Sequence, residues 1–186
     1  MDTKGFTMLP RVRISYPHLT ERSTYQGQVG KFDGTFLLDK ERDADLIAEI
    51  KGDMATLLKT ELKRSKLPAD KLCMRDGDET GKPEYEGHMI LKASTDQTPL
   101  IVDRYTAKPV AEGENGGIYG GCHVNAKIRL WAQNNGYGQR INANLVAVQF
   151  ADDGEAFSGS HVAQDDAMDG FAPAADADSF FDEAAA

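Results

Sequence analysis

Residues 122–133 carry the side chains whose types and spacing are best suited to chemistry in this chain. Every second residue from Cys122 is small or apolar, which predicts a strand that packs one face into a core. The other face presents two cations, two amides, an imidazole and the single tryptophan of the chain. An indole ring is costly to leave in water without a use, so this face is a candidate binding surface. Its residues are His123, Asn125, Lys127, Arg129, Trp131 and Gln133.

Cations beside an aromatic ring suit the binding of a single-stranded nucleic acid. Bases offer a π-face on which a ring can stack, and phosphates offer charge to lysine and arginine. Each base–aromatic stack contributes roughly 1–3 kcal/mol and tolerates any base. The strand alone also permits a plainer interpretation, in which a loop covers Trp131 and the cations Lys127 and Arg129 are simply solvated.

Basic and aromatic residues elsewhere extend this predicted surface. Arg11 and Arg13 share one parity of the first predicted strand, opposite an apolar parity that includes Ile14 and Tyr16. Tyr137 lies at the tip of a glycine-flanked hairpin, where a ring has little to pack against. We expect the cations to contact phosphates and the rings to stack bases. The predicted DNA-binding set is Arg11, Arg13, Lys92, Arg104, Lys127, Arg129, Trp131, Tyr137 and Arg140, with Tyr105 and Tyr119 as weaker candidates.

Alternating polar and apolar residues predict the strands that must position these side chains. The predicted strands cover residues 7–16, 31–38, 87–95, 100–105, 122–133 and 139–150, with turns and loops between them. Apolar residues at three- and four-residue steps predict one amphipathic helix, which begins at an Asp39 or Asp43 cap and ends near Arg64. One helix cannot supply the crossovers of a parallel sheet. The prediction is therefore a mainly β protein, a small barrel of five to six strands with one helix. Basic strands and aromatic-tipped loops on such a barrel indicate an OB-fold barrel, because OB folds bind single strands in this way.

The charges divide the chain into two parts. All 21 lysines and arginines lie in residues 1–150 together with 20 acids, whereas residues 151–186 contain ten acids and no lysine or arginine. This composition predicts a nearly neutral domain over 1–150 and a disordered acidic, aromatic tail over 151–186. The net charge of −9 therefore does not argue against a nucleic-acid partner.

The acidic tail permits three interpretations. It could be a solubility appendage, or it could compete with phosphate for a basic groove. It could also be a docking peptide in which Phe180 and Phe181, between Asp178 and Asp182, enter an apolar pocket rimmed by cations. The last two roles are compatible, because a tail released by DNA becomes available to a partner.

Five sequence motifs resemble those of a family of bacteriophage single-stranded DNA-binding proteins. They occupy residues 13–19 (RISYPHL), 75–79 (RDGDE), 85–88 (YEGH), 119–126 (YGGCHVNA) and 136–150 (GYGQRINANLVAVQF). The family is similar to the replication proteins of short-tailed phages, which have an OB fold followed by an acidic tail. The resemblance implies sequence-tolerant binding of single-stranded DNA in phage replication and recombination. In the docking interpretation of the tail, its partner is a phage polymerase or helicase-primase.

Other functions are less well supported by the residues. Asp76, Asp78 and Glu79 near His88 could form a magnesium-dependent nuclease site, although Asp-Gly is also a strong turn signal. A module whose tail carries its whole function is a further alternative. Cysteines and histidines lack the spacing of a zinc site, and no phosphate-binding loop is present. We expect no enzyme activity, cofactor, metal or membrane partner, and we expect the cytoplasm of the bacterial host as the location. The sequence does not decide whether the protein forms a homodimer.

Overall fold

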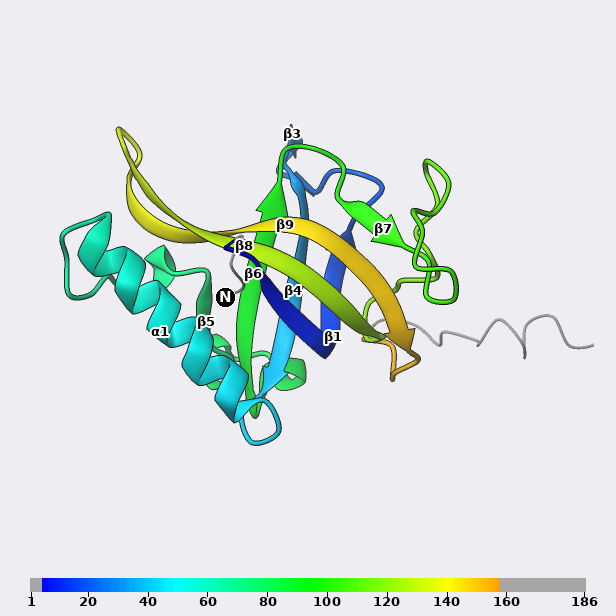
Figure 1. The fold of residues 1–186 in the computed structure, drawn as a ribbon, viewed down its shortest axis with the longest axis horizontal. Helices are drawn as coiled ribbons and strands as arrows, with labels where there is room; N and C mark the ends of the chain where they lie inside the picture. Colours follow the sequence, from blue (N-terminus) through cyan, green and yellow to red (C-terminus); the bar gives the residue numbers. More distant parts are fainter. Residues whose placement is uncertain (1–4, 158–186) are drawn as a thin grey trace, which may run out of the picture.

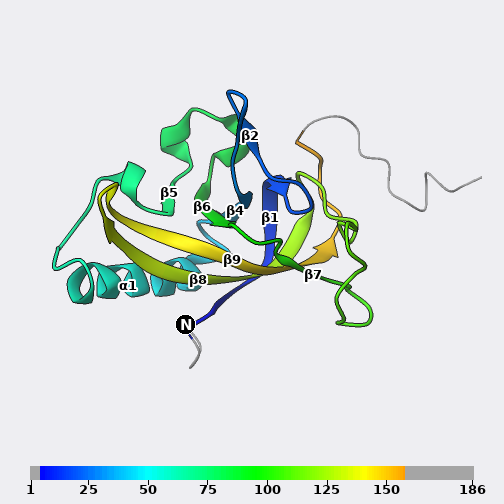
Figure 2. The same cartoon turned by 90° about the horizontal axis from the view of Figure 1, so that it is seen from above.

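The computed structural model describes residues 5–157. Five strands form a closed ring around the core, and Figures 1 and 2 show how the ring strands curve past one another. Around the ring, the strands follow the order β6-β4-β1-β8-β9, and a parallel pairing of β9 with β6 closes it. The other ring pairs are antiparallel, which confirms the predicted OB-type barrel. The ring strands are β1 (Thr7–His18), β4 (Phe32–Asp39), β6 (His88–Thr95), β8 (His123–Asn135) and β9 (Gly138–Asp152).

Short elements that the sequence pattern did not predict surround the ring. The expected loop over 18–30 contains a small hairpin of β2 (Thr24–Tyr25) and β3 (Gln28–Val29). The expected turns over 66–86 contain the edge strand β5 (Met74–Asp76), which pairs with β6. Two or three residues are too few to show an alternation. Three 3₁₀ turns flank β5, namely η1 (Ala69–Lys71), η2 (Asp78–Thr80) and η3 (Pro83–Tyr85).

The predicted fourth strand is shorter than expected. It is β7 (Leu100–Val102), which pairs in parallel with β9 at the edge of the sheet. The strand ends there because the Asp103 carboxylate accepts hydrogen bonds from the backbone N–H groups of Tyr105 and Thr106. Such an Asx turn competes with ladder pairing.

The helix α1 (Ala44–Thr60) lies against β8 and β9, as Figures 1 and 2 show. Its buried residues, Ile47, Ile50, Met54 and Leu58, join the core, which confirms the predicted apolar stripe. Asp43 precedes the helix but does not cap it through its side chain. Its carboxylate instead accepts a 2.9 Å hydrogen bond from the Asp39 N–H and closes the turn before the helix.

Two irregularities in β1 change which of its side chains face outward. The backbone has φ of +48° at Arg11 and +50° at Tyr16, and the pairing register shifts at both places. Ser15 is consequently 1% exposed and Tyr16 is 54% exposed, so the predicted apolar parity is wrong for Tyr16. A bulge reverses the side-chain alternation because it inserts one unpaired residue.

A second, smaller cluster covers part of the outer face of the barrel. Leu37 and Ile90, which are paired across β4 and β6, are buried beneath Tyr85 and Phe157. Ile90 is buried although it shares its parity in β6 with the polar His88, Lys92 and Ser94, and Phe157 lies within the range predicted as tail. The ring of Phe157 lies 4.3 Å from the Arg13 guanidinium, which also donates 2.6 Å to the Glu155 carbonyl. The described fold thus continues beyond the predicted domain end at residue 150.

We expect Gly121→Ala to destabilise the protein because Gly121 touches this C-terminal segment. Gly121 has φ of +113°, and an added Cβ would overlap the Glu155 carbonyl oxygen. The unfavourable φ alone costs roughly 1–3 kcal/mol. Gly117→Ala is the matched control, because Gly117 has φ of +80° but no atom near the added Cβ. Thermal unfolding should show a larger fall in melting temperature for Gly121→Ala, and equal falls would contradict the expected clash.

Candidate nucleic-acid interface

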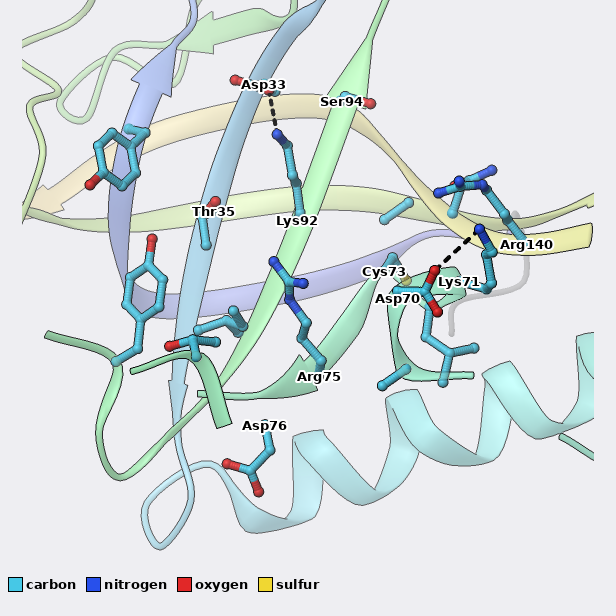
Figure 3. A pocket seen from close by; sticks show the side chains of 18 of the residues that line it. Asp33, Thr35, Asp70, Lys71, Cys73, Arg75, Asp76, Lys92, Ser94 and Arg140 are labelled. Carbon is cyan, nitrogen blue, oxygen red and sulfur yellow. Dashed lines mark ion pairs between the residues drawn. The ribbon is translucent and has the colours of Figure 1, made fainter. Parts of the chain in front are cut away.

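A continuous groove runs over the outer face of the barrel, along β4, β6 and β9. It consists of one hollow of about 840 Å³ and a second of about 520 Å³. The two hollows share the lining residues Ser94, Arg140, Asn142 and Ala143, so they form one surface rather than two sites. We call this surface the groove. Figure 3 shows part of its larger hollow.

Strand pairing places the floor of the groove. Thr35 of β4 lies opposite Lys92 of β6, and Asp33 lies opposite Ser94. All four side chains line the larger hollow, whereas their neighbour Phe36 is fully buried. Successive side chains of a strand point to opposite faces of the sheet, so the residues next to the core positions point toward the groove.

Arg75 and Arg140 are the two cations of the groove that are not engaged elsewhere in the described part of the chain. Arg75 extends from β5 and Arg140 from β9, and Figure 3 shows both at the larger hollow. Within residues 5–157 neither side chain forms an ion pair or a side-chain hydrogen bond. A phosphate could therefore bind either guanidinium without breaking a contact of the fold.

Lys92 is held differently, by a carboxylate in the groove floor. Its ammonium lies 3.0 Å from the Asp33 carboxylate, as the dashed line in Figure 3 marks. The same carboxylate lies 2.8 Å from Nδ1 of the His18 ring. Asp33 is nearly buried, while the Lys92 side chain is mostly exposed. The carboxylate thus keeps the ammonium at the base of the groove, accessible from solvent.

Trp131 lines the smaller hollow. The indole is 42% exposed and lies on β8 opposite Asn142 of β9. Arg129 and Lys31 line the same hollow, and the Lys31 ammonium contacts Asp96 at 2.8 Å. The hydrogen bond from Lys31 holds the pKa of the Asp96 carboxyl below its usual value. Trp131 and Arg129 of the predicted surface therefore face solvent within a groove, and no loop of residues 5–157 covers the indole.

Four of the predicted binding residues, Lys92, Arg129, Trp131 and Arg140, line the groove. The others do not line it, and three of them form side-chain hydrogen bonds within the fold. Arg11 pairs with Asp152 at 2.5 Å, Arg13 anchors the C-terminal segment, and the Tyr119 hydroxyl donates to Asp153 at 2.9 Å. A DNA contact by any of these residues stays a prediction.

The remaining predicted residues lie outside the groove lining. Lys127 lies 4.9 Å from the ring of Phe6, which it shares with Arg129 at 4.4 Å. The Arg104 guanidinium lies 5.2 Å from the rings of both Tyr105 and Phe150. Tyr105 is 85% exposed, and Tyr137, which is 91% exposed, lies at the tip of the β8–β9 hairpin. Phe180, Phe181, Asp178 and Asp182 lie outside the described residues.

Sequence reasoning missed several groove residues. Arg75 was assigned to a turn because the three-residue strand β5 has no detectable period. Tyr16 was assigned to the core because the bulge that turns it outward has no signal in the alternation. Lys31, Lys71 and Lys82 also line the hollows, and only their charge in loops or at strand ends could have indicated them.

The acidic residues of the nuclease alternative serve a turn in the structure. The Lys40 ammonium donates to Asp76 and to Asp78, each at 2.6 Å. These bonds lower the pKa of both carboxyls and raise that of the lysine. Asp78 also accepts the Gly87 N–H at 2.8 Å. Among residues 5–157 there is no group of three or more histidine, cysteine, aspartate or glutamate side chains arranged to hold a metal ion.

The two cysteines are thiols that burial keeps protonated. Burial raises the pKa of Cys73 to about 12 and that of Cys122 to about 11. A protonated thiol is a weak nucleophile and a poor metal ligand.

In the described part of the chain, no helix is long and apolar enough to span a membrane.

Comparison with known proteins places this fold among phage proteins. A family model described as the ssDNA-binding protein of Enterobacter phage Enc34 matches residues 7–181. A protein of Acyrthosiphon pisum secondary endosymbiont phage 1, named putative protein p50, is 33% identical over 171 residues. The match covers 87% of this chain and 91% of that protein.

Solved structures agree with this placement. The single-stranded DNA-binding protein of bacteriophage Enc34, solved in complex with ssDNA, is 31% identical with a TM-score of 0.75. The match covers 84% of this chain and 91% of that one. The single-stranded DNA-binding protein gp2.5 of bacteriophage T7 is 13% identical with a TM-score of 0.50, and the match covers 91% of this chain and 96% of that one. At that identity the T7 protein is evidence for the fold alone.

Proposed function

Because the chain belongs to the family of the ssDNA-binding protein of Enterobacter phage Enc34, we propose that it binds single-stranded DNA along the groove. The binding would be sequence-tolerant and non-catalytic, and would serve phage DNA replication and recombination in the cytoplasm of the bacterial host. Stacking and phosphate contacts suit this role, because neither depends on the identity of the base.

One observation carries the proposal. Two guanidinium groups without partners in the described chain, Arg75 and Arg140, lie in the same groove as the exposed indole of Trp131. The guanidiniums supply phosphate contacts and the indole supplies a π-surface. A folded protein has little to gain from this combination unless a ligand fills the groove.

Titration of Trp131 fluorescence with oligothymidylate at several salt concentrations tests the proposal. A base stacked on the indole should quench the emission. If four or five phosphates are neutralised, the logarithm of the binding constant should fall against the logarithm of salt with a slope of roughly −3. No quenching and no anisotropy change of a labelled oligonucleotide at low salt would contradict the proposal.

We further propose that the acidic tail competes with DNA for the groove and is recognised by a phage replication protein. Residues 158–186 contain seven acids and no lysine or arginine, and the described chain ends at Phe157 on the outer face of the barrel. Phe157 packs with Tyr85 and Ile90, and both of these also line the groove. The tail would therefore begin beside one end of the groove. Phe180 and Phe181 would dock on a polymerase or helicase-primase.

Removing residues 158–186 should tighten binding of single-stranded DNA at low salt, because seven negative charges leave the vicinity of the groove. The gain should shrink as salt screens the charges, since the Debye length falls to about 8 Å at 0.15 M. Anisotropy titrations of both proteins at two salt concentrations measure the effect. Truncation after Phe150 is the informative comparison, because it also removes the packing of Phe157 and should lower the melting temperature. Equal affinities of the full chain and the 1–157 chain at every salt concentration would contradict competition.

A further inference from the structure

Tyr16 is an exposed aromatic residue at the end of the groove that lies away from Trp131. Tyr16 lines only the larger hollow, and Trp131 lines only the smaller one. The two hollows adjoin at the residues that line both of them, Arg140 among them. One strand that follows the groove would therefore pass both rings.

The backbone at Tyr16 is unusual for a large residue. Its φ of +50° lies in the left-handed region, which glycine adopts without steric cost and a tyrosine rarely does. This conformation coincides with the register shift that turns the ring out of the barrel. Residues in unfavourable backbone conformations concentrate at binding sites, where the strained backbone holds a side chain in position for the ligand.

A cation accompanies the Tyr16 ring. The Lys82 ammonium lies 3.2 Å from the Tyr16 hydroxyl oxygen and 4.5 Å from the ring centroid. The same ammonium lies 5.1 Å from the ring of Tyr85. Ring and charge therefore occur together at this end of the groove, as Trp131 and Arg129 do at the other.

We propose that Tyr16 is a second base-stacking platform for the same single strand, and that Lys82 contacts the phosphate beside the stacked base. The assignment rests on the proposed binding of single-stranded DNA and extends it to the far end of the groove. Two stacking points at opposite ends, with cations between them, hold an extended strand along its length.

Moving the tryptophan tests this placement directly. In a Trp131→Phe background, Tyr16→Trp makes position 16 the source of the tryptophan emission. Oligothymidylate should quench that emission at saturation. Leu100→Trp in the same background is the control, because Leu100 is 47% exposed against 54% for Tyr16 but lies outside the groove lining. No quenching at position 16, or equal quenching at positions 16 and 100, would overturn the assignment.

Affinity provides the second measurement. Loss of one stack corresponds to a weakening of roughly 5- to 150-fold, so Tyr16→Leu should bind oligothymidylate that much more weakly, and Tyr16→Phe should stay within about twofold. Leu100→Ala, which removes an exposed side chain outside the groove lining, should bind like the parent protein. Tyr16→Gly relieves the backbone and should lose the same affinity without a fall in melting temperature.

The outcomes separate this inference from the proposed function. If Tyr16→Leu and Tyr16→Gly bind like the parent while oligothymidylate still quenches Trp131, the Tyr16 assignment is wrong and the proposed function stands. If Tyr16→Phe loses as much affinity as Tyr16→Leu, the hydroxyl contact rather than stacking is responsible, which also overturns the assignment. If the parent protein itself fails to bind, the proposed function is wrong.

Discussion

Replacing Arg75 and Arg140 together by alanine should weaken binding of oligothymidylate by about 100- to 10,000-fold at low salt. A hydrogen bond to a charged group contributes roughly 1.5–3 kcal/mol, and two guanidiniums would be removed from phosphates. The salt dependence should weaken as well, by about 0.7 in log–log slope for each lost phosphate contact. Fluorescence anisotropy of a labelled oligonucleotide across a salt series measures both quantities.

Stability should change little in this double variant, because neither arginine forms an ion pair or a side-chain hydrogen bond with another described residue. The matched control is Lys51→Ala with Lys59→Ala, which removes the same charge from exposed positions of α1, outside the groove lining. The control should retain nearly all affinity. Equal losses in the two double variants would mean that net charge, rather than the groove, controls binding.

Trp131→Ala should weaken binding by about 1–3 kcal/mol, the contribution of one base stacked on an aromatic ring. The indole is 42% exposed in the groove, so its removal opens no cavity in the barrel core and the melting temperature should change only slightly. Anisotropy measures the affinity, since this variant lacks the tryptophan emission. Trp131→Phe should recover most of the loss, because a smaller ring can still stack.

The control for Trp131 is an exposed apolar side chain outside the groove lining. Leu100→Ala removes such a side chain from β7, with 47% exposure against 42% for Trp131, and should leave affinity unchanged. A loss below about 0.5 kcal/mol for Trp131→Ala, with an unchanged melting temperature, would exclude the indole from the base-stacking contacts expected of such a groove.

Alternation alone was sufficient to predict the long strands of the barrel. From His123 to Leu130, β8 alternates more exposed and buried residues as predicted, because a period of two follows directly from the geometry of an extended chain. The helix was recognisable for the same reason, since its apolar residues recur at its own period. The solvent-facing position of Trp131 among cations followed from parity, and the structure adds the groove around it.

Parity could not predict which cations are free to bind a ligand. Arg11 and Arg13 alternate correctly with apolar neighbours, yet Asp152 and the segment ending at Phe157 engage them, from more than 140 residues away in the chain. Arg75 had no signal, because a three-residue strand acquires its place only by pairing with β6.

The division between the two kinds of information is physical. Composition and periodicity can be read from short stretches of sequence. They were therefore sufficient to predict a mainly β chain with one helix, an acidic tail, and an indole beside cations on one strand face. Bulges, ring closure and long-range pairing depend on contacts that form only in the folded chain. Those contacts turn Tyr16 outward, anchor Arg13 in the fold, and bring Arg75 of β5 and Arg140 of β9 to one groove.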